Sequence, residues 1–486
     1  MLSCTAVDET VSTHSAGCLC HRPEMASLSK RIGADLSRRG FIAGASAALP
    51  ALFGVKAARA QPSPTPPHPI VFSNVRLFDG RSSTLRNGVR VLIEGSRIKA
   101  VASDNPPPPE GARVIDCANR VLMPGLIDAH WHALFAGLPM QAIMTADMGF
   151  VFLAASAEAE RTLMRGFTTI RDLGGPAFPL QQAIDQGLVP GPRIYPCGAM
   201  LTTTGGHGDL RPLSDLPRSP GGPISALERT GGSMIADSAD ELRLRVREQM
   251  LQGASQIKIV GGGGVSSPRS PLDMSTFSVG DLRAAVDTAA DWNTYVAVHA
   301  YAPDTVQRAI AAGAQCVEHA HLMDEPTARM LAEKAVWLSI QPFVGDDDTV
   351  PLTGPSRQKQ IQVFGGTDRA YRLAKAHGVK TAFGSDLLFS PMLATRQGTM
   401  LTHLSRWYSN PEILTMATAT NAELLALSGP RNPYDGKLGV VEPGAFADLL
   451  VIDGNPLEDI TLLADPAAKL AVIMKHGTIY KNTLHA

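Results

Sequence analysis

Short apolar runs recur along the middle of this 486-residue chain, and segments of helical character separate them. Strands that alternate with helices are typical of βαβ units and a parallel sheet. Eight units in one domain predict a closed (β/α)8 TIM barrel. An open doubly wound sheet is the alternative, but no GxGxxG turn follows the first run, so the barrel is favoured. The eight runs are Leu126–Asp128, Thr168–Ile170, Arg193–Tyr195, Gln256–Val260, Val296–Val298, Cys316–Glu318, Val336–Ile340 and Lys380–Phe383.

The two ends of the chain share a different residue pattern. From Ile70 to Val121, short alternating runs are broken by turns such as Asn87-Gly88, and similar runs return after Gly439. This pattern is typical of strands joined by tight turns. The sequence therefore predicts an α/β fold in which the barrel, residues 123–430, is inserted in a small β-sandwich built from residues 70–122 and 431–486.

The N-terminus has the features of a targeting segment. Arg38-Arg39 precedes the apolar run Ile42–Val55, and Ala58-Arg59-Ala60 follows it. This is the pattern of a twin-arginine (Tat) signal with an A-x-A cleavage site. The apolar run is shorter than the roughly 20 residues that a membrane-spanning helix needs, so a permanent anchor is disfavoured. We expect residues 1–60 to be a Tat signal region and the mature protein to be periplasmic or secreted, with no stable membrane anchor after signal cleavage.

Two details surround this signal. Cysteines and histidines precede Met25, which we interpret as the true start; a metal site among them is the weaker alternative. After the signal, residues 61–69 form a Pro-rich linker. The mature chain would keep three cysteines, spaced too widely for a CxxC motif or a disulfide framework. They are Cys117, Cys197 and Cys316.

The charges are balanced, with 44 basic and 45 acidic residues. Nothing in this balance indicates an electrostatic grip on nucleic acid. A small molecule or dipeptide is therefore the expected partner, and a homo-oligomer is compatible with the sequence.

Candidate metal ligands stand at the ends of several predicted strands. His130 and His132 follow the first run two residues apart, so an extended backbone points both imidazoles to one side. His299, His319 and Asp386 end three other runs. An HxH pair alone is weak evidence, but four histidines and an aspartate at the same rim are hard to explain by packing. Such ligands suit zinc, with manganese or iron as alternatives.

Lys258 lies inside the apolar run Gln256–Val260, where alternation directs it into the barrel. An unpaired buried ammonium is costly and repels a metal ion. The structural alternative is a lysine paired with a nearby acid. The functional alternative is carbamylation by carbon dioxide, which turns the cation into a carboxylate able to bridge two metals.

Taken together, these residues resemble the amidohydrolase superfamily, in its branch of metal-dependent Xaa-Pro dipeptidase-like and ochratoxinase-like enzymes. The resemblance extends from Ile70 to the C-terminus. It is carried by MPGLIDAHWHA (123–133), GFTTIRDLGG (166–175), GPRI (191–194), TGGHGD (204–209), QIKIVGGGG (256–264), VAVHAY (296–301), VEHAH (317–321), FGSD (383–386) and PGAFADLLVIDGNPLEDI (443–460).

The resemblance implies a binuclear site. By it, His130, His132 and Asp386 hold one metal, and His299 and His319 hold the other. Carbamylated Lys258 bridges the two ions, which are expected to be Zn²⁺. The family also implies a metal-bridging hydroxide, with Asp386 as the catalytic proton shuttle.

Neighbouring residues are secondary candidates. Tyr301 points the same way as His299 and is either a donor to the substrate or an aromatic packed at the barrel mouth. His207 lies in TGGHGD at the start of a long Gly/Pro-rich loop, where a substrate-side role is favoured over a solvated histidine. His321 and Trp131 are bulkier than the motifs suggest, which leaves the substrate size open.

The expected function is hydrolysis of an amide or peptide-type C–N bond, as in X-Pro dipeptides or N-acyl amino acids such as ochratoxin. A hydrolase or deaminase of cyclic amides or imines, imidazolonepropionase-like, is a second reading. Such enzymes usually have one metal and lack the bridging lysine, so Lys258 argues against them. A non-catalytic metal-binding barrel is the third reading.

Overall fold

Eight parallel strands form the centre of the fold in this computed structural model, which describes residues 68–103, 106–216 and 224–484. Each coincides with a run predicted from the sequence. They are β6 (Leu126–Trp131), β7 (Phe167–Asp172), β8 (Arg193–Pro196), β11 (Ile257–Val260), β12 (Val296–Ala300), β13 (Cys316–His319), β14 (Trp337–Ile340) and β15 (Thr381–Phe383). Because helices separate them, the predicted α/β class is confirmed.

These strands pair within two sheets. One has the order β6-β7-β8, and the other continues from β11 through β15. Two short strands that the sequence analysis missed, β9 (Met200–Thr202) and β10 (Ser233–Ile235), extend the second sheet beyond β11. Backbone hydrogen bonds link the two sheets: Ser255 N, just before β11, donates to Pro196 O of β8 at 2.8 Å, and Asp386 N, just after β15, donates to His130 O of β6 at 2.8 Å.

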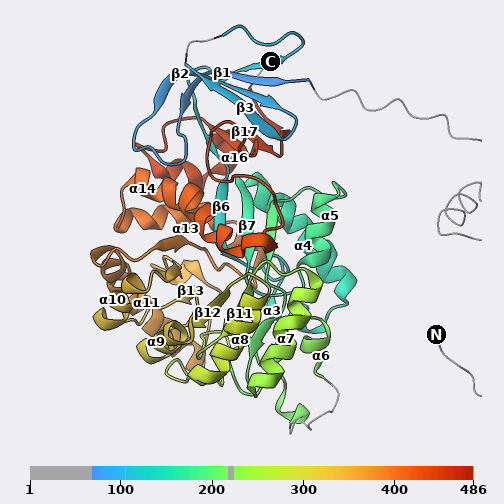
Figure 1. Ribbon diagram of the computed structural model, residues 1–486, viewed down its shortest axis with the longest axis vertical. Coiled ribbons are helices and arrows are strands. Elements are labelled where there is room, and N and C mark those ends of the chain that lie inside the picture. Colours follow the sequence, from blue (N-terminus) through green and yellow to red (C-terminus); the bar gives the residue numbers. More distant parts are fainter. Residues whose placement is uncertain (1–67, 104–105, 217–223, 485–486) are drawn as a thin grey trace, which may run out of the picture. The chain divides into compact units, whose positions relative to one another are not determined.

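Helices cover the parallel strands on the outside (Figure 1). Their apolar residues face the strands, since the largest hydrophobic cluster contains residues from both. The helices of this part of the chain are α3 (Met140–Thr145), α4 (Met148–Met164), α5 (Phe178–Asp185), α6 (Ala226–Arg229), α7 (Ala239–Gln252), α8 (Val279–Asp291), α9 (Pro303–Ala312), α10 (Glu325–Glu333), α11 (Gly354–Ala376), α12 (Pro391–Ala394), α13 (Gln397–His403), α14 (Asn410–Thr415) and α15 (Asn421–Leu425). One more helix, α16 (Pro466–Lys469), lies beside β17 (Leu470–Lys475).

Strands from the two ends of the chain pair in a separate eight-stranded sheet. The antiparallel pairing of β16 with β5 joins the two ends. Figure 1 shows the blue strands beside the red β17. The strands are β1 (Ile70–Leu77), β2 (Arg86–Glu94), β3 (Arg97–Ala102), β4 (Arg113–Asp116), β5 (Val121–Pro124), β16 (Leu449–Ile452), β17 (Leu470–Lys475) and β18 (Thr478–Asn482).

A buried ion pair ties this terminal sheet to the parallel strands. Arg193, on β8, donates from Nε and Nη2 to Asp448 at 2.9 and 3.2 Å, and its guanidinium lies 3.8 Å from the ring centre of Phe446. The pair satisfies a cation that would otherwise be buried alone.

The predicted signal region, the start at Met25 and export all rest on residues outside the described part of the chain. Among the described residues, none of the helices is both long and apolar enough to cross a membrane.

Candidate metal centre

Six side chains predicted from the sequence line one cavity at the carboxyl ends of the parallel strands. Parallel strands bring their carboxyl ends to the same rim, so residues far apart in the chain meet there. Asp386 follows β15, and the other five lie on or just after four different strands. The six are His130, His132, Lys258, His299, His319 and Asp386.

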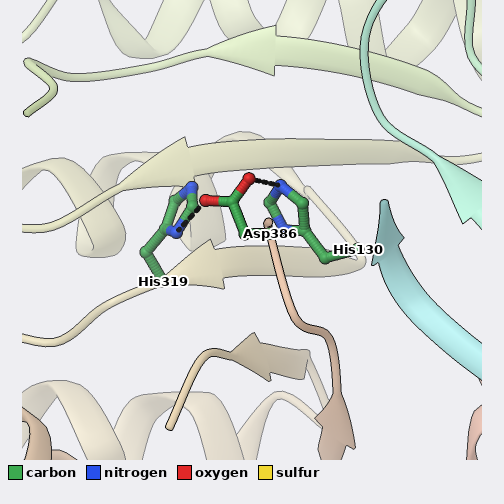
Figure 2. A group of neighbouring side chains, drawn as sticks. All are labelled: His130, His319 and Asp386. Atoms are coloured by element: carbon green, nitrogen blue, oxygen red, sulfur yellow. Dashed lines mark ion pairs between the residues drawn. The ribbon is translucent and has the colours of Figure 1, made fainter. Parts of the chain in front are cut away.

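Asp386 stands between imidazoles (Figure 2). Its Oδ1 lies 3.3 Å from His130 Nε2 and 3.1 Å from His132 Nε2, and its Oδ2 lies 3.9 Å from His319 Nδ1. Ligand atoms of His130, His319 and Asp386 all fall within 4.8 Å of one another. Nitrogen and carboxylate oxygen at this spacing fit a divalent metal ion such as zinc.

The contact between Asp386 and the first strand follows from a second buried aspartate. Asp128, on β6, accepts hydrogen bonds from the backbone N–H groups of His130 and Ser385, both at 3.0 Å. Gly384 allows the close approach, because a Cβ there would lie 2.4 Å from His130 Cβ. These contacts fix the end of β15 against the end of β6.

Two of the candidate ligands have unusual backbone conformations. His319 has φ 79° and Asp386 has φ 52°. Residues other than glycine rarely adopt positive φ, and such positions cluster at functional sites. The backbone thus turns these two side chains into the cavity at a cost in local stability.

An ion pair that the sequence analysis missed orients His130. Arg171 on β7 donates from Nη2 to Glu318 Oε1 at 2.7 Å, and Glu318 Oε2 lies 2.8 Å from His130 Nδ1. All three side chains are buried. With its Nδ1–H donated to Glu318, His130 presents the Nε2 lone pair to the cavity. The signal was present in the sequence, because RD and VEH place charged residues inside apolar strands.

Other partners hold the remaining histidines. His319 Nδ1 lies 2.6 Å from Gln341 Oε1, and His299 Nε2 lies 2.9 Å from Gly263 O. Burial lowers the pKa of His130 to about 4 and holds the pKa values of His299 and His319 well below 6.5. The imidazoles are therefore neutral near pH 7, the state in which they bind metals.

Lys258 is buried, and within the described residues its ammonium forms no hydrogen bond or ion pair. Burial lowers the pKa of Lys258, although the charges of Glu318 and Asp386 act in the opposite direction. The described residues therefore do not support the alternative in which Lys258 forms an ion pair with a nearby acid.

The two secondary candidates also reach the cavity. The His207 ring lies 4.6 Å from the His299 ring, and its Nδ1 lies 2.9 Å from Ser267 Oγ. The Tyr301 ring packs against those of His299 and His319, at 5.1 and 4.9 Å. Both are thus close enough to the ligand cluster to contact a substrate.

Trp131 and His321 are buried but do not line this cavity. His321 packs on Phe343, with ring centres 5.5 Å apart, while the Trp131 ring lies 5.7 Å from the Arg165 guanidinium. The bulk of these two residues therefore does not narrow the cavity directly. The cavity is lined instead by apolar side chains: Phe135, Met140, Met200, Leu210, Val265, Phe343, Val350, Leu352, Val363, Phe364, Leu388, Phe389 and Leu393.

The sequence profile of the amidohydrolase family matches residues 121–480, a stretch that contains all eight parallel strands and all six candidate ligands. The chain belongs to the amidohydrolase family. This amidohydrolase is a hydrolase that acts on carbon–nitrogen bonds, as the sequence predicts.

This amidohydrolase is similar in sequence or structure to three known proteins. Ochratoxinase from Aspergillus niger is 30% identical over 422 residues, covering 83% of this chain and 85% of its own. A prolidase solved with N-methylphosphonate-L-proline superposes with a TM-score of 0.79 at 35% identity, over 85% of this chain and 100% of its own. A Xaa-Pro dipeptidase with bound methionine superposes with a TM-score of 0.74 at 27% identity, over 85% of this chain and 100% of its own.

We predict that Glu318→Gln weakens metal binding by about 10- to 100-fold, the usual effect of losing a residue that orients a ligand. The amide keeps the volume of the side chain but loses the charge that faces Arg171. Competition with a chelator measures the affinity. Glu158 is a matched control, because it is also buried and accepts from a buried arginine, Arg165, at 2.7 Å. Glu158→Gln should bind metal normally, and equal losses in both variants would contradict the assignment.

Proposed function

We propose that this amidohydrolase binds two divalent metal ions, most favourably Zn²⁺, and cleaves X-Pro dipeptides or N-acyl amino acids such as ochratoxin. The observation that carries the proposal is Lys258, a buried amine without a partner in the described residues, among five potential metal ligands. The similarity to the prolidase and the ochratoxinase supplies the substrate classes.

A carbamate on Lys258 accounts for its position. The amine nitrogen would bond to the carbon of carbon dioxide and release one proton, leaving a carboxylate in place of a cation. The reaction needs a neutral amine, which burial favours. The new anionic oxygens would lie among His130, His132, His299, His319 and Asp386 and could bridge two ions.

When bound, the ions would polarise the scissile carbonyl and lower the pKa of a water molecule. Asp386 is the carboxylate best placed to take up that proton at Oδ1 or Oδ2 and to pass it to the leaving amine. The Tyr301 hydroxyl would donate to the oxygen that becomes negative during the reaction.

The other side of the cavity would select the substrate. His207 would contact a polar group of the substrate opposite the metals, and the apolar wall would accept a bulky uncharged group. This division agrees with ochratoxin-like amides, in which an aromatic acyl group is joined to an amino acid.

We further propose that the two parallel sheets are parts of one (β/α)8 barrel, residues 123–430, inserted in a sandwich-like unit from residues 70–122 and 431–486. The separate hydrophobic cluster of the terminal strands supports this division. It contains residues from both ends, among them Phe72, Val91, Leu449 and Met474.

A substrate screen tests the reaction. The zinc-loaded protein should hydrolyse at least one of X-Pro dipeptides, N-acyl-phenylalanines and ochratoxin, and release of the free amino acid is the readout. Elemental analysis should find about two ions per chain. Turnover restricted to cyclic amides or imines, with one ion bound, would refute the proposal.

Replacement of Lys258 tests the carbamate. Lys258→Ala should lose activity together with metal content, because the ions lose a shared anionic ligand. Added acetate or propionate should restore part of the activity, whereas an amine of similar size should not. Lys258→Arg keeps a positive charge and should be inactive; near-normal turnover with two bound metals would overturn the mechanism.

The twin-arginine signal is tested in cells. Replacing Arg38 and Arg39 by lysine should retain the enzyme in the cytoplasm, as measured by activity after cell fractionation. Transport through the Tat route would allow the protein to fold around its metals before export. Unchanged periplasmic activity in the double variant would exclude this route.

A further inference from the structure

Lys359 is a buried cation outside the ligand cluster. It lies on α11 and is 7% exposed. Its ammonium donates to Gly264 O at 2.7 Å, Ser267 O at 2.6 Å and Ser270 O at 2.9 Å. Within the described residues it has no carboxylate partner. All three N–H groups of the ammonium thus donate to backbone carbonyls of one loop, residues 264–270, which follows β11.

This loop borders the substrate side of the cavity. Ser267 Oγ lies 2.9 Å from His207 Nδ1 and accepts from Gly208 N at 3.1 Å. Gly264 packs directly on the imidazole, because a Cβ there would lie 2.3 Å from His207 Cγ. Two of the three residues whose carbonyls Lys359 holds therefore contact His207 or its loop.

Burying an ammonium without a counter-ion is unfavourable, so the arrangement needs a compensating role. Helical packing does not supply one, since an apolar side chain would fill this position at lower cost. The ammonium instead gathers three carbonyls that would otherwise point apart along an irregular loop. Hydrogen bonds to a charged donor are stronger than neutral ones.

The geometry points to Lys359 as a positioning residue that fixes loop 264–270 and, through Ser267 and Gly264, the orientation of His207. This inference rests on the proposed function, in which His207 contacts the substrate. Lys359 itself touches neither the metal ligands nor the cavity.

Limited proteolysis tests the loop without any substrate. Arg269 is exposed near the end of the loop and is a trypsin site. Lys359→Met should speed cleavage after Arg269 by at least about tenfold, because the loop opens locally. The matched control is Lys375→Met on the same helix, where Nζ donates to Trp407 O at 2.8 Å. Equal cleavage rates in both variants would overturn the inference.

A double-mutant cycle tests the link to His207. In the zinc-loaded enzyme, Lys359→Met should lower kcat/KM about tenfold, but less than about twofold in a His207→Asn background. A tenfold loss in both backgrounds would mean that Lys359 does not act through His207. If Lys359→Met does not fold, Ser267→Ala replaces it in the same cycle. A wild-type enzyme without amidase activity would refute the proposed function, while the cleavage rates would still decide whether Lys359 fixes the loop.

Discussion

The contact of Arg171 with Glu318 is the interaction on which the metal centre depends. It joins β7 to β13 inside the fold, and both side chains are fully buried. A buried ion pair stabilises little by itself, and loss of one partner would leave an uncompensated charge. Its value here is orientation, because Glu318 also fixes His130. The same carboxylate therefore links the packing of the strands to the direction of a ligand.

The electrostatics of the rim follow from this arrangement. Burial keeps the imidazoles of His130, His299 and His319 neutral, and the charge of Glu318 is already matched by Arg171. Among the candidate ligands, the carboxylate facing the cavity is Asp386, whose pKa stays low despite burial because His130 and His132 are adjacent.

The sequence predicts which candidate ligands meet at one cavity because these residues obey a local rule. His130, His299 and His319 each end an apolar run, and parallel strands bring such ends together. The supporting residues obey no local rule. Gln341 and Lys359 act on partners that other strands and loops supply, and Lys359 lies 95 residues from Gly264. Only the folded chain shows those contacts. The sequence analysis missed the short strands β9 and β10 because they flank a Gly/Pro-rich segment whose composition predicts a loop.

The two sides of the cavity are built differently, and this difference explains how far substrate identity can be inferred. The metal side comes from strands whose register is fixed by hydrogen bonds, so its residues match the family motifs. Much of the substrate side comes from loop 264–270 and α11, which apart from Gly264 lie outside the family motifs. Lys359 connects these two segments by ordering one against the other. Rigidity on the substrate side thus depends on a charge buried outside the motifs, and a chain that kept every candidate metal ligand but lost Lys359 would have a less ordered substrate pocket.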